Sequence, residues 1–138
     1  MTLQLSAAAT STAGILLLSV LAVEWGGAFL LKVVRGGVEA TELQRRLYRA
    51  GHAHAGVLVT LGLLTVLFTE ATDLTGPVAS VARSGVPAAA ILMSGGFFLA
   101  AAGRGRTQAR RSGLVLVTIG ALSLAAGVGT LGVALLLG

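Results

Sequence analysis

The chain has 138 residues, of which 55% are hydrophobic, 11% are charged and 20 are glycine. Soluble domains carry about 25% charged residues, so this composition excludes a disordered chain, a nucleic-acid-binding domain and a soluble enzyme surface. Cysteine is absent, which excludes disulfides, thiolate metal sites and a cysteine nucleophile.

Four long segments with few or no charges predict four membrane-spanning helices in a single domain, residues 1–138. A helix of about 20 apolar residues crosses the hydrocarbon core of a bilayer, whereas barrel strands would be shorter and would alternate in polarity. We therefore expect an all-α, four-helix transmembrane bundle. The predicted spans are residues 13–34, 50–69, 84–103 and 113–136.

The first of these segments lacks the features of a cleaved secretion signal. Such a signal begins with a basic region and ends at a small-residue cleavage site. Residues 1–23 contain no lysine or arginine, and the apolar sequence continues past Glu24 to Leu31. We therefore expect the segment to be retained as the first span.

The basic residues predict the orientation of the spans. Nine of the ten lie in residues 32–49 and 103–112, at or within the first and third connections, and lysine and arginine accumulate in short cytoplasmic loops. We expect connections 35–49 and 104–111 to be cytoplasmic and both termini to be outside, in a multi-pass protein of a bacterial plasma membrane. These nine residues are Lys32, Arg35, Arg45, Arg46, Arg49, Arg104, Arg106, Arg110 and Arg111.

The first connection is long enough to contain structure of its own. Residues 41–48 have a helical pattern, and Thr41 is a candidate N-cap for a helix that continues into the second span. Pro77 and Pro87 are expected in or near the second connection, where they would interrupt the chain without kinking a helix.

Small residues at four-residue spacing predict close helix packing, because they let helix backbones approach one another in lipid. This pattern is also compatible with a homo-oligomer. It occurs at Ala121, Ala125 and Gly129, at Gly51 and Ala55, and at Ala22 and Gly26.

Glu24 is the strongest functional candidate, because an ionisable side chain inside a membrane is costly and is by default a candidate for function. It lies eleven residues from Arg35, or ~16 Å at the helical rise of 1.5 Å per residue, which is near the bilayer centre. Gly27 and Ala28 lie one turn away on the same face and leave room for a partner. The alternatives are a protonated Glu24 that hydrogen-bonds a hydroxyl such as that of Thr60, or a shallower position for the span.

His52 and His54 form the second candidate feature, just inside the level of Arg49. Imidazole titrates near neutral pH and binds metals or haem. Side chains two positions apart on a regular helix point ~200° away from each other, so these histidines cannot direct both rings at one ion. A zinc site would need Glu24 and water, or a second subunit. Proton handling, substrate contact and a purely structural role therefore stay open alternatives.

The segment from Glu24 to Lys32 resembles the first helix of small multidrug resistance exporters. In that family a membrane-embedded glutamate is followed by glycine, leucine and lysine at the offsets of Gly27, Leu30 and Lys32. The resemblance implies a four-helix proton/cation antiporter that acts as a dimer, in which Glu24 binds the proton and the substrate in turn.

The start of the second span resembles two other families. Residues 49–54 are similar to the second helix of the membrane-associated eicosanoid and glutathione metabolism family, which implies a thiol substrate. Residues 53–59 resemble the haem-ligating second helix of haem–copper oxidases, which leaves haem as an alternative cofactor at His54. The composition of the whole chain resembles that of small four-helix membrane proteins of high-GC bacteria.

We expect a small proton- or ion-coupled transport protein with Glu24 as the titrating centre and with His54 and His52 at its cytoplasmic mouth. No P-loop, partnered nucleophile or metal-ligand spacing occurs, so we expect no catalytic or metal-binding residue and favour a non-enzyme. The expected partners are the lipid bilayer and further copies of the chain or subunits of a complex, not nucleic acid. The alternatives are a haem-, quinone- or thiol-binding redox subunit and a structural subunit. Candidate substrate or lipid contacts are Lys32, Arg49, Thr60 and Trp25.

Overall fold

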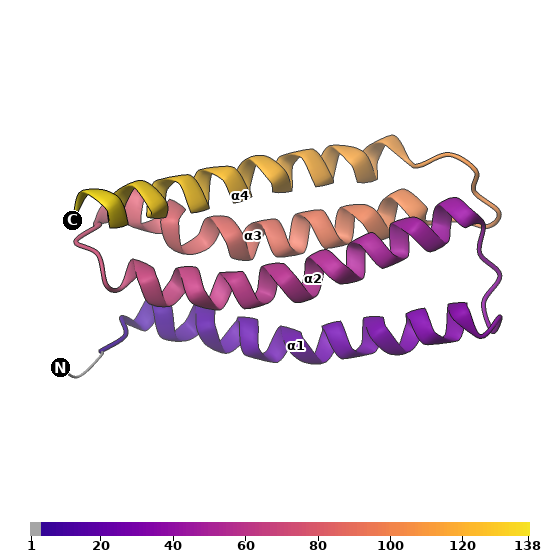
Figure 1. The fold of residues 1–138 in the computed structure, drawn as a ribbon, viewed down its shortest axis with the longest axis horizontal. Coiled ribbons are helices and arrows are strands. Elements are labelled where there is room, and N and C mark those ends of the chain that lie inside the picture. The colour runs from indigo at the N-terminus through magenta and orange to yellow at the C-terminus, as the bar shows by residue number, and fades with distance from the viewer. Residues whose placement is uncertain (1–3) are drawn as a thin grey trace.

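The computed structural model describes residues 4–138, which form four long helices. All four are long and apolar enough to cross a membrane, and they run alternately up and down so that the start of the first helix and the end of the fourth lie at one end (Figure 1). We call this the terminal end, and the opposite one, with connections 35–41 and 102–110, the arginine-rich end. The all-α, four-helix prediction is confirmed. The helices are α1 (Ala7–Val34), α2 (Glu42–Thr69), α3 (Gly76–Ala101) and α4 (Arg111–Leu137).

The helices form an open bundle, arranged side by side in chain order (Figure 1). Within the described residues α3 packs extensively on both α2 and α4, whereas α1 packs mainly on α2, touches α3 slightly and does not contact α4. Only Ala9, Leu16 and Val33 of α1 are buried. The first helix is therefore the outermost and the least covered by the rest of the chain.

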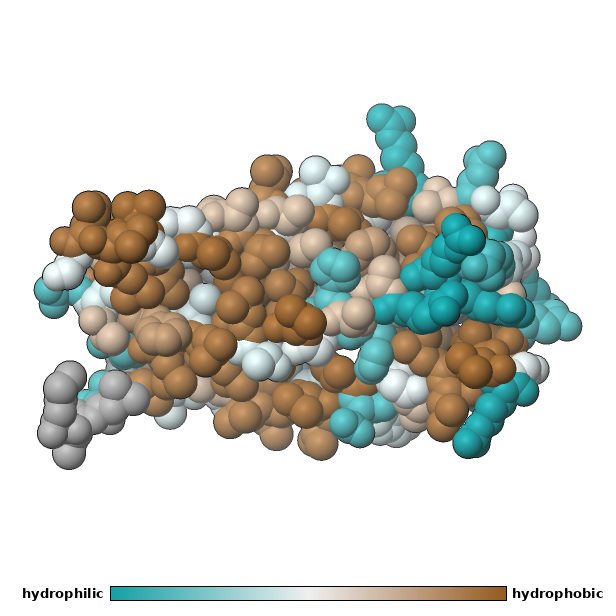
Figure 2. Space-filling view, viewed as in Figure 1, coloured by the Kyte–Doolittle hydropathy of each residue, from teal (hydrophilic) through white to brown (hydrophobic). Residues whose placement is uncertain are grey.

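The face of the bundle in Figure 2 is largely apolar along the helices and hydrophilic mainly at the arginine-rich end. Large apolar side chains on α1 and α4 are widely exposed, among them Leu18 at 70% and Leu136 at 87%. A water-soluble monomer rarely exposes such continuous apolar area. The side faces of the bundle are thus suited to an apolar medium.

Each helix begins before its predicted span, because uncharged sequence marks the apolar part of a helix and not its start, whereas α3 ends at Ala101 and not at residue 103. The second helix starts at Glu42, and Thr41 is its N-cap, as predicted. The hydroxyl of Thr41 accepts the amide of Gln44, and the Gln44 side chain accepts the amide of Thr41. This reciprocal capping box satisfies two amides that a helix start leaves free.

The prediction that Pro87 lies in or near a connection is wrong, because α3 begins at Gly76 and includes it. Pro77 occupies the first turn, where its missing N–H is not needed. Pro87 packs beside Gly62 of α2. A Cβ added to Gly62 would lie 3.5 Å from Cγ of Pro87 and 3.2 Å from a methyl group of Leu16. The absence of a side chain at Gly62 therefore lets α1, α2 and α3 meet at this level.

The closest packing joins α3 and α4 through glycines. On α4 the buried face carries Gly113, Gly120 and Gly127 at seven-residue spacing. A Cβ on Gly85 of α3 would lie 2.6 Å from the Cα of Gly127, and one on Gly96 would lie 2.8 Å from the carbonyl oxygen of Gly113. The two backbones are thus in direct contact.

The predicted packing face of Ala121, Ala125 and Gly129 is not used within the chain, since all three residues are exposed. The α4 sequence contains two sets of small residues at regular spacing, and α3 packs against the set that includes Gly113. Of the other predicted positions, Gly51 is buried against Phe97 and Phe98, as expected. The remaining ones are Ala55, which is half-buried, Ala22, which is exposed, and Gly26, which is half-buried.

At the arginine-rich end, the side chain of Gln44 joins the two connections. Its Nε2 donates to the carbonyl oxygens of Ala101 at 2.9 Å and Gly103 at 2.6 Å. The hydroxyl of Thr41 donates to the carbonyl of Arg106. Gln44 is only 3% exposed, and its amide is fully hydrogen-bonded, as a buried polar group requires.

Candidate functional site

Glu24 lies on the outer flank of α1 and not inside the bundle. The preceding residue, Val23, faces α2, because its Cγ1 lies 4.0 Å from where a Cβ of Gly56 would be. Successive residues turn by ~100° around a helix, so Glu24 points sideways past α2. Its side chain is exposed and has no ion pair within residues 4–138.

The alternative of a hydrogen bond between Glu24 and Thr60 is not found in the structure. The Thr60 hydroxyl donates instead to the carbonyl of Gly56, one turn earlier on its own helix, at 3.0 Å. This local bond satisfies the hydroxyl without bringing α1 and α2 together at that level. Lys32, two turns from Glu24, lies over Gly37, so its stem follows the chain toward the arginine-rich end.

His52 packs against the two glycines that follow Glu24 and Trp25. A Cβ on Gly26 would lie 3.2 Å from Nδ1 of His52, and one on Gly27 would lie 3.4 Å from its Cε1. The glycine pair therefore forms a notch in α1 that receives the imidazole of α2. No described residue hydrogen-bonds the His52 ring, so both of its nitrogens are available to a hydrogen-bonding ligand.

His54 faces α3, as the expected divergence of the two histidines requires. Its ring centroid is 4.9 Å from that of Phe97, and its Nδ1 lies 2.8 Å from the carbonyl oxygen of Ala50. A carbonyl oxygen only accepts, so Nδ1 is the donor in this contact, and Nε2 has no hydrogen bond to a described residue. The two histidines therefore belong to different helix interfaces.

An aromatic cluster closes the arginine-rich end of the α1–α2–α3 interface. Phe29 meets Tyr48 edge-on with ring centroids 5.1 Å apart, and Tyr48 stacks on Phe98 at 5.8 Å. The three rings come from α1, α2 and α3, one from each. Such contacts add about 1 kcal/mol each beyond the burial of their area, and they hold the helices together beside His52.

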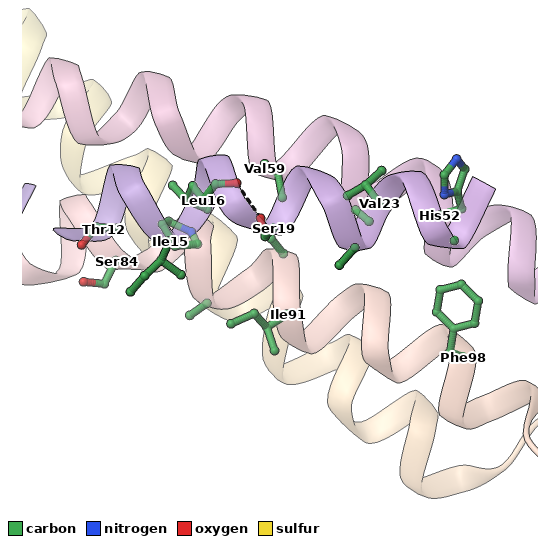
Figure 3. A pocket seen from close by; sticks show the side chains of 16 residues that line it. Thr12, Ile15, Leu16, Ser19, Val23, His52, Val59, Ser84, Ile91 and Phe98 are labelled. Carbon is green, nitrogen blue, oxygen red and sulfur yellow. Dashed lines mark hydrogen bonds between the residues drawn. The ribbon is translucent and has the colours of Figure 1, made fainter. Parts of the chain in front are cut away.

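Between α1 and α3, with α2 at its base, runs an apolar groove of about 470 Å³. His52 and Phe98 lie at one end, and Thr12 and Ser84 lie at the other (Figure 3). The Ser19 hydroxyl in its wall donates to a carbonyl of its own helix at 2.7 Å. The groove therefore suits an elongated apolar molecule with one hydrogen-bonding group. Glu24 does not line it.

The other candidate contacts lie apart from one another. Trp25 is 82% exposed on α1. Arg49 lies on α2 in a hollow with Arg45 and Glu42, while Thr60 is exposed farther along the same helix. The structure thus brings His52 to the residues next to Glu24 but does not gather all predicted residues into one chamber.

A polar cluster at the terminal end, which we call the Glu70 clamp, did not emerge from the sequence. The Glu70 carboxylate accepts the backbone N–H of Ser6 at 2.7 Å, the Ser6 hydroxyl at 3.1 Å and Nη2 of Arg83 at 2.9 Å. The Ser6 amide, the Ser6 hydroxyl and Arg83 hold the pKa of Glu70 below its usual value, while burial opposes them. The clamp ties the start of α1 to α2 and α3.

One signal for this clamp was present in the sequence. Glu70 and Arg83 are opposite charges on either side of the second connection. The interpretation of that stretch as a loop up to residue 83 concealed the pair, because two exposed loop charges need no partner. In the structure α3 begins earlier, and Arg83 is brought beside the end of α2.

No group of three or more histidine, aspartate or glutamate side chains within residues 4–138 is placed to hold a metal ion. His52 and His54 face different helices, and Glu24 points away from both interfaces. A haem on either side of α2 could likewise be ligated by only one of the two histidines, because His52 faces α1 and His54 faces α3. The described residues of a single chain thus offer no paired ligands for either group.

No protein-family model, curated protein or solved structure matches this chain. Function is therefore inferred from the geometry above.

Proposed function

We propose that the chain is an integral membrane protein, with both termini outside, in which Glu24 is the titrating centre of proton- or ion-coupled transport by a homo-oligomer. The carrying observation is that Glu24 is exposed and unpaired within residues 4–138. It lies ~16 Å along α1 from Arg35, about half the thickness of a hydrocarbon core.

A second copy is the partner that the open bundle favours. A carboxylate facing hydrocarbon costs about 3 kcal/mol, and no described residue compensates Glu24. The first helix is the least covered of the four, so its flank is free to pack against another chain. Two copies of α1 would enclose Glu24 in a protein-lined space, where a proton or a cation neutralises it.

The coupling then follows from the charge of Glu24. A protonated carboxyl is neutral and tolerates helix contact, whereas the carboxylate requires a bound cation or water. Proton and cation therefore compete for the same group, and the occupied form decides how α1 packs. Because His52 lies in the glycine notch next to Glu24, its imidazole is placed to sense that packing.

We expect Glu24→Gln to abolish proton movement. Purified protein in proteoliposomes containing pyranine is exposed to a potassium diffusion potential, and acidification of the lumen is recorded. The wild type should carry protons, Glu24→Asp should keep part of the flux, and Glu24→Gln should lose it at least tenfold, because the amide cannot titrate.

Glu39→Gln is the matched control, since Glu39 is an exposed carboxylate in the α1–α2 connection. It should retain the wild-type flux. Equal flux in wild type and Glu24→Gln contradicts the proposal, as does a wild type without flux. The oligomer is measured by light scattering after purification in mild detergent. A stable assembly with other proteins would instead indicate a structural subunit of a complex.

The groove favours a second candidate function, that of a quinone-binding redox subunit. A quinone has an elongated apolar tail and carbonyl oxygens that accept hydrogen bonds. The groove offers apolar walls over about 470 Å³ and an imidazole at one end. This candidate does not involve Glu24, which makes the two functions separable.

For this candidate we expect a short-chain ubiquinone to bind the protein in detergent, as measured by isothermal titration calorimetry. His52→Leu removes the hydrogen-bond donor and should weaken binding about tenfold, the value of one lost hydrogen bond to a buried acceptor. Ala88→Phe fills the groove wall and should abolish binding. Binding that neither substitution changes would place the quinone elsewhere, and Glu24→Gln should leave it intact.

A further inference from the structure

A hollow between the end of α1 and the start of α2 combines two unpaired arginines with apolar side chains. It has a volume of about 290 Å³ and is lined by Leu30, Val33 and Val34 of α1 and by Glu42, Arg45 and Arg49 of α2. Val34 is 78% exposed, so the apolar side of the hollow opens outward. The hollow is therefore cationic on one side and apolar on the other.

Within residues 4–138 the positive charge in this hollow is only partly neutralised. Glu42 is paired with Arg46, whose Nε lies 2.9 Å from Oε1 of Glu42. Arg45 and Arg49 have no ion pair within residues 4–138. The four side chains together carry a net charge of +2, and that excess lies on the two unpaired arginines.

Local structure also orients these arginines. They are four residues apart on α2 and share a face, and Nε of Arg49 donates to the carbonyl oxygen of Arg45 at 3.3 Å. This bond holds the stem of Arg49 along the helix and leaves its terminal amino groups free. Guanidinium groups bind phosphate oxygens through paired hydrogen bonds.

We propose that this basic hollow binds one anionic phospholipid, with its phosphate between Arg45 and Arg49 and an acyl chain against Leu30 and Val34. The apolar side of the hollow requires a ligand with a hydrocarbon part, which a free phosphate lacks. Basic pockets between helices at the cytoplasmic surface recognise such headgroups. The site lies outside the transport and quinone sites, but it rests on the proposed membrane location and on the proposed cytoplasmic position of the arginine-rich end.

The test is native mass spectrometry of the full chain released from vesicles of phosphatidylcholine with 20 mole per cent phosphatidylglycerol, about one lipid in five as in a weakly anionic leaflet. The wild type should retain one phosphatidylglycerol in preference to phosphatidylcholine. Arg45→Gln/Arg49→Gln should lower that retention roughly thirtyfold, from the loss of two interfacial arginines.

Arg111→Gln is the matched control, because Arg111 is an exposed arginine at the same end of the bundle and does not line the hollow. It should retain the lipid as the wild type does. Equal retention in the double variant, or equal retention of the two lipids by the wild type, overturns the proposal. Displacement of the lipid by millimolar inorganic phosphate also overturns it, since it would identify a free-anion site. Glu24→Gln should not affect retention, which separates this site from the transport proposal.

Discussion

Gly85→Ala is expected to lower the free energy of unfolding by about 2 kcal/mol, within the range for overpacked interiors. A Cβ at this position would lie 2.6 Å from the Cα of Gly127 and 2.8 Å from the carbonyl oxygen of Ser123. Both atoms belong to the backbone of α4, so no side chain can rotate away. The two helices would have to separate along their closest contact. Unfolding in mixed micelles with increasing dodecyl sulfate, followed by circular dichroism, measures the change.

Gly95→Ala is the control on the same helix, because nothing lies within 4 Å of its added Cβ. It should leave stability unchanged or raise it by up to about 1 kcal/mol through helix propensity. Gly127→Ala and Gly129→Ala form the corresponding pair on α4, and only the first should destabilise. If the members of each pair behave alike, the glycine contact between α3 and α4 is wrong.

Arg83→Met is expected to destabilise the protein by about 3 kcal/mol at pH 7, as removal of one partner from a largely buried ion pair does. The side chains of Arg83 and Glu70 are only 17% and 9% exposed. Without Arg83 the Glu70 carboxylate stays largely buried, and its charge is balanced only by hydrogen bonds from the Ser6 amide and hydroxyl. Glu70→Met in addition should recover part of the loss, because the uncompensated charge is removed as well.

Arg46→Met provides the matched comparison on a pair of the same chemistry. Arg46 and Glu42 also lie 2.9 Å apart, but their side chains are 72% and 61% exposed. Solvent screens such pairs, so this substitution should cost less than about 0.5 kcal/mol. Equal losses for Arg83→Met and Arg46→Met would contradict the clamp.

The Glu70 clamp also predicts a dependence on pH. The pKa of Glu70 is lower in the folded protein than the ordinary value of 4.5, so its stabilisation is complete above that value. It is lost as the pH falls through the folded pKa. The melting temperature of the wild type should therefore drop below pH 4.5, and that of Glu70→Gln should change less. Asp73→Asn, at an exposed neighbour, should keep the wild-type profile.

The sequence by itself determined the number, order and apolar character of the helices. Charges are few, and the uncharged stretches of 20 residues or more predict long apolar helices that could span a membrane. The N-cap at Thr41 and the divergence of His52 and His54 were also accessible, because both follow from local chain geometry. Glu24 was recognisable as the one acid outside the connections, whatever its surroundings.

Only the tertiary structure decided which face of each helix meets which neighbour. In a soluble helix the polar face identifies the outside, but these helices are apolar on every side, and that signal is lost. The sequence therefore could not distinguish the buried Gly113 and Gly127 from the exposed Gly129. The outward direction of Glu24, the notch that receives His52 and the Glu70–Arg83 pair depend on that choice of faces. Close packing between specific helix backbones decides which faces meet, and neither the hydropathy nor the charge of the sequence predicts that choice.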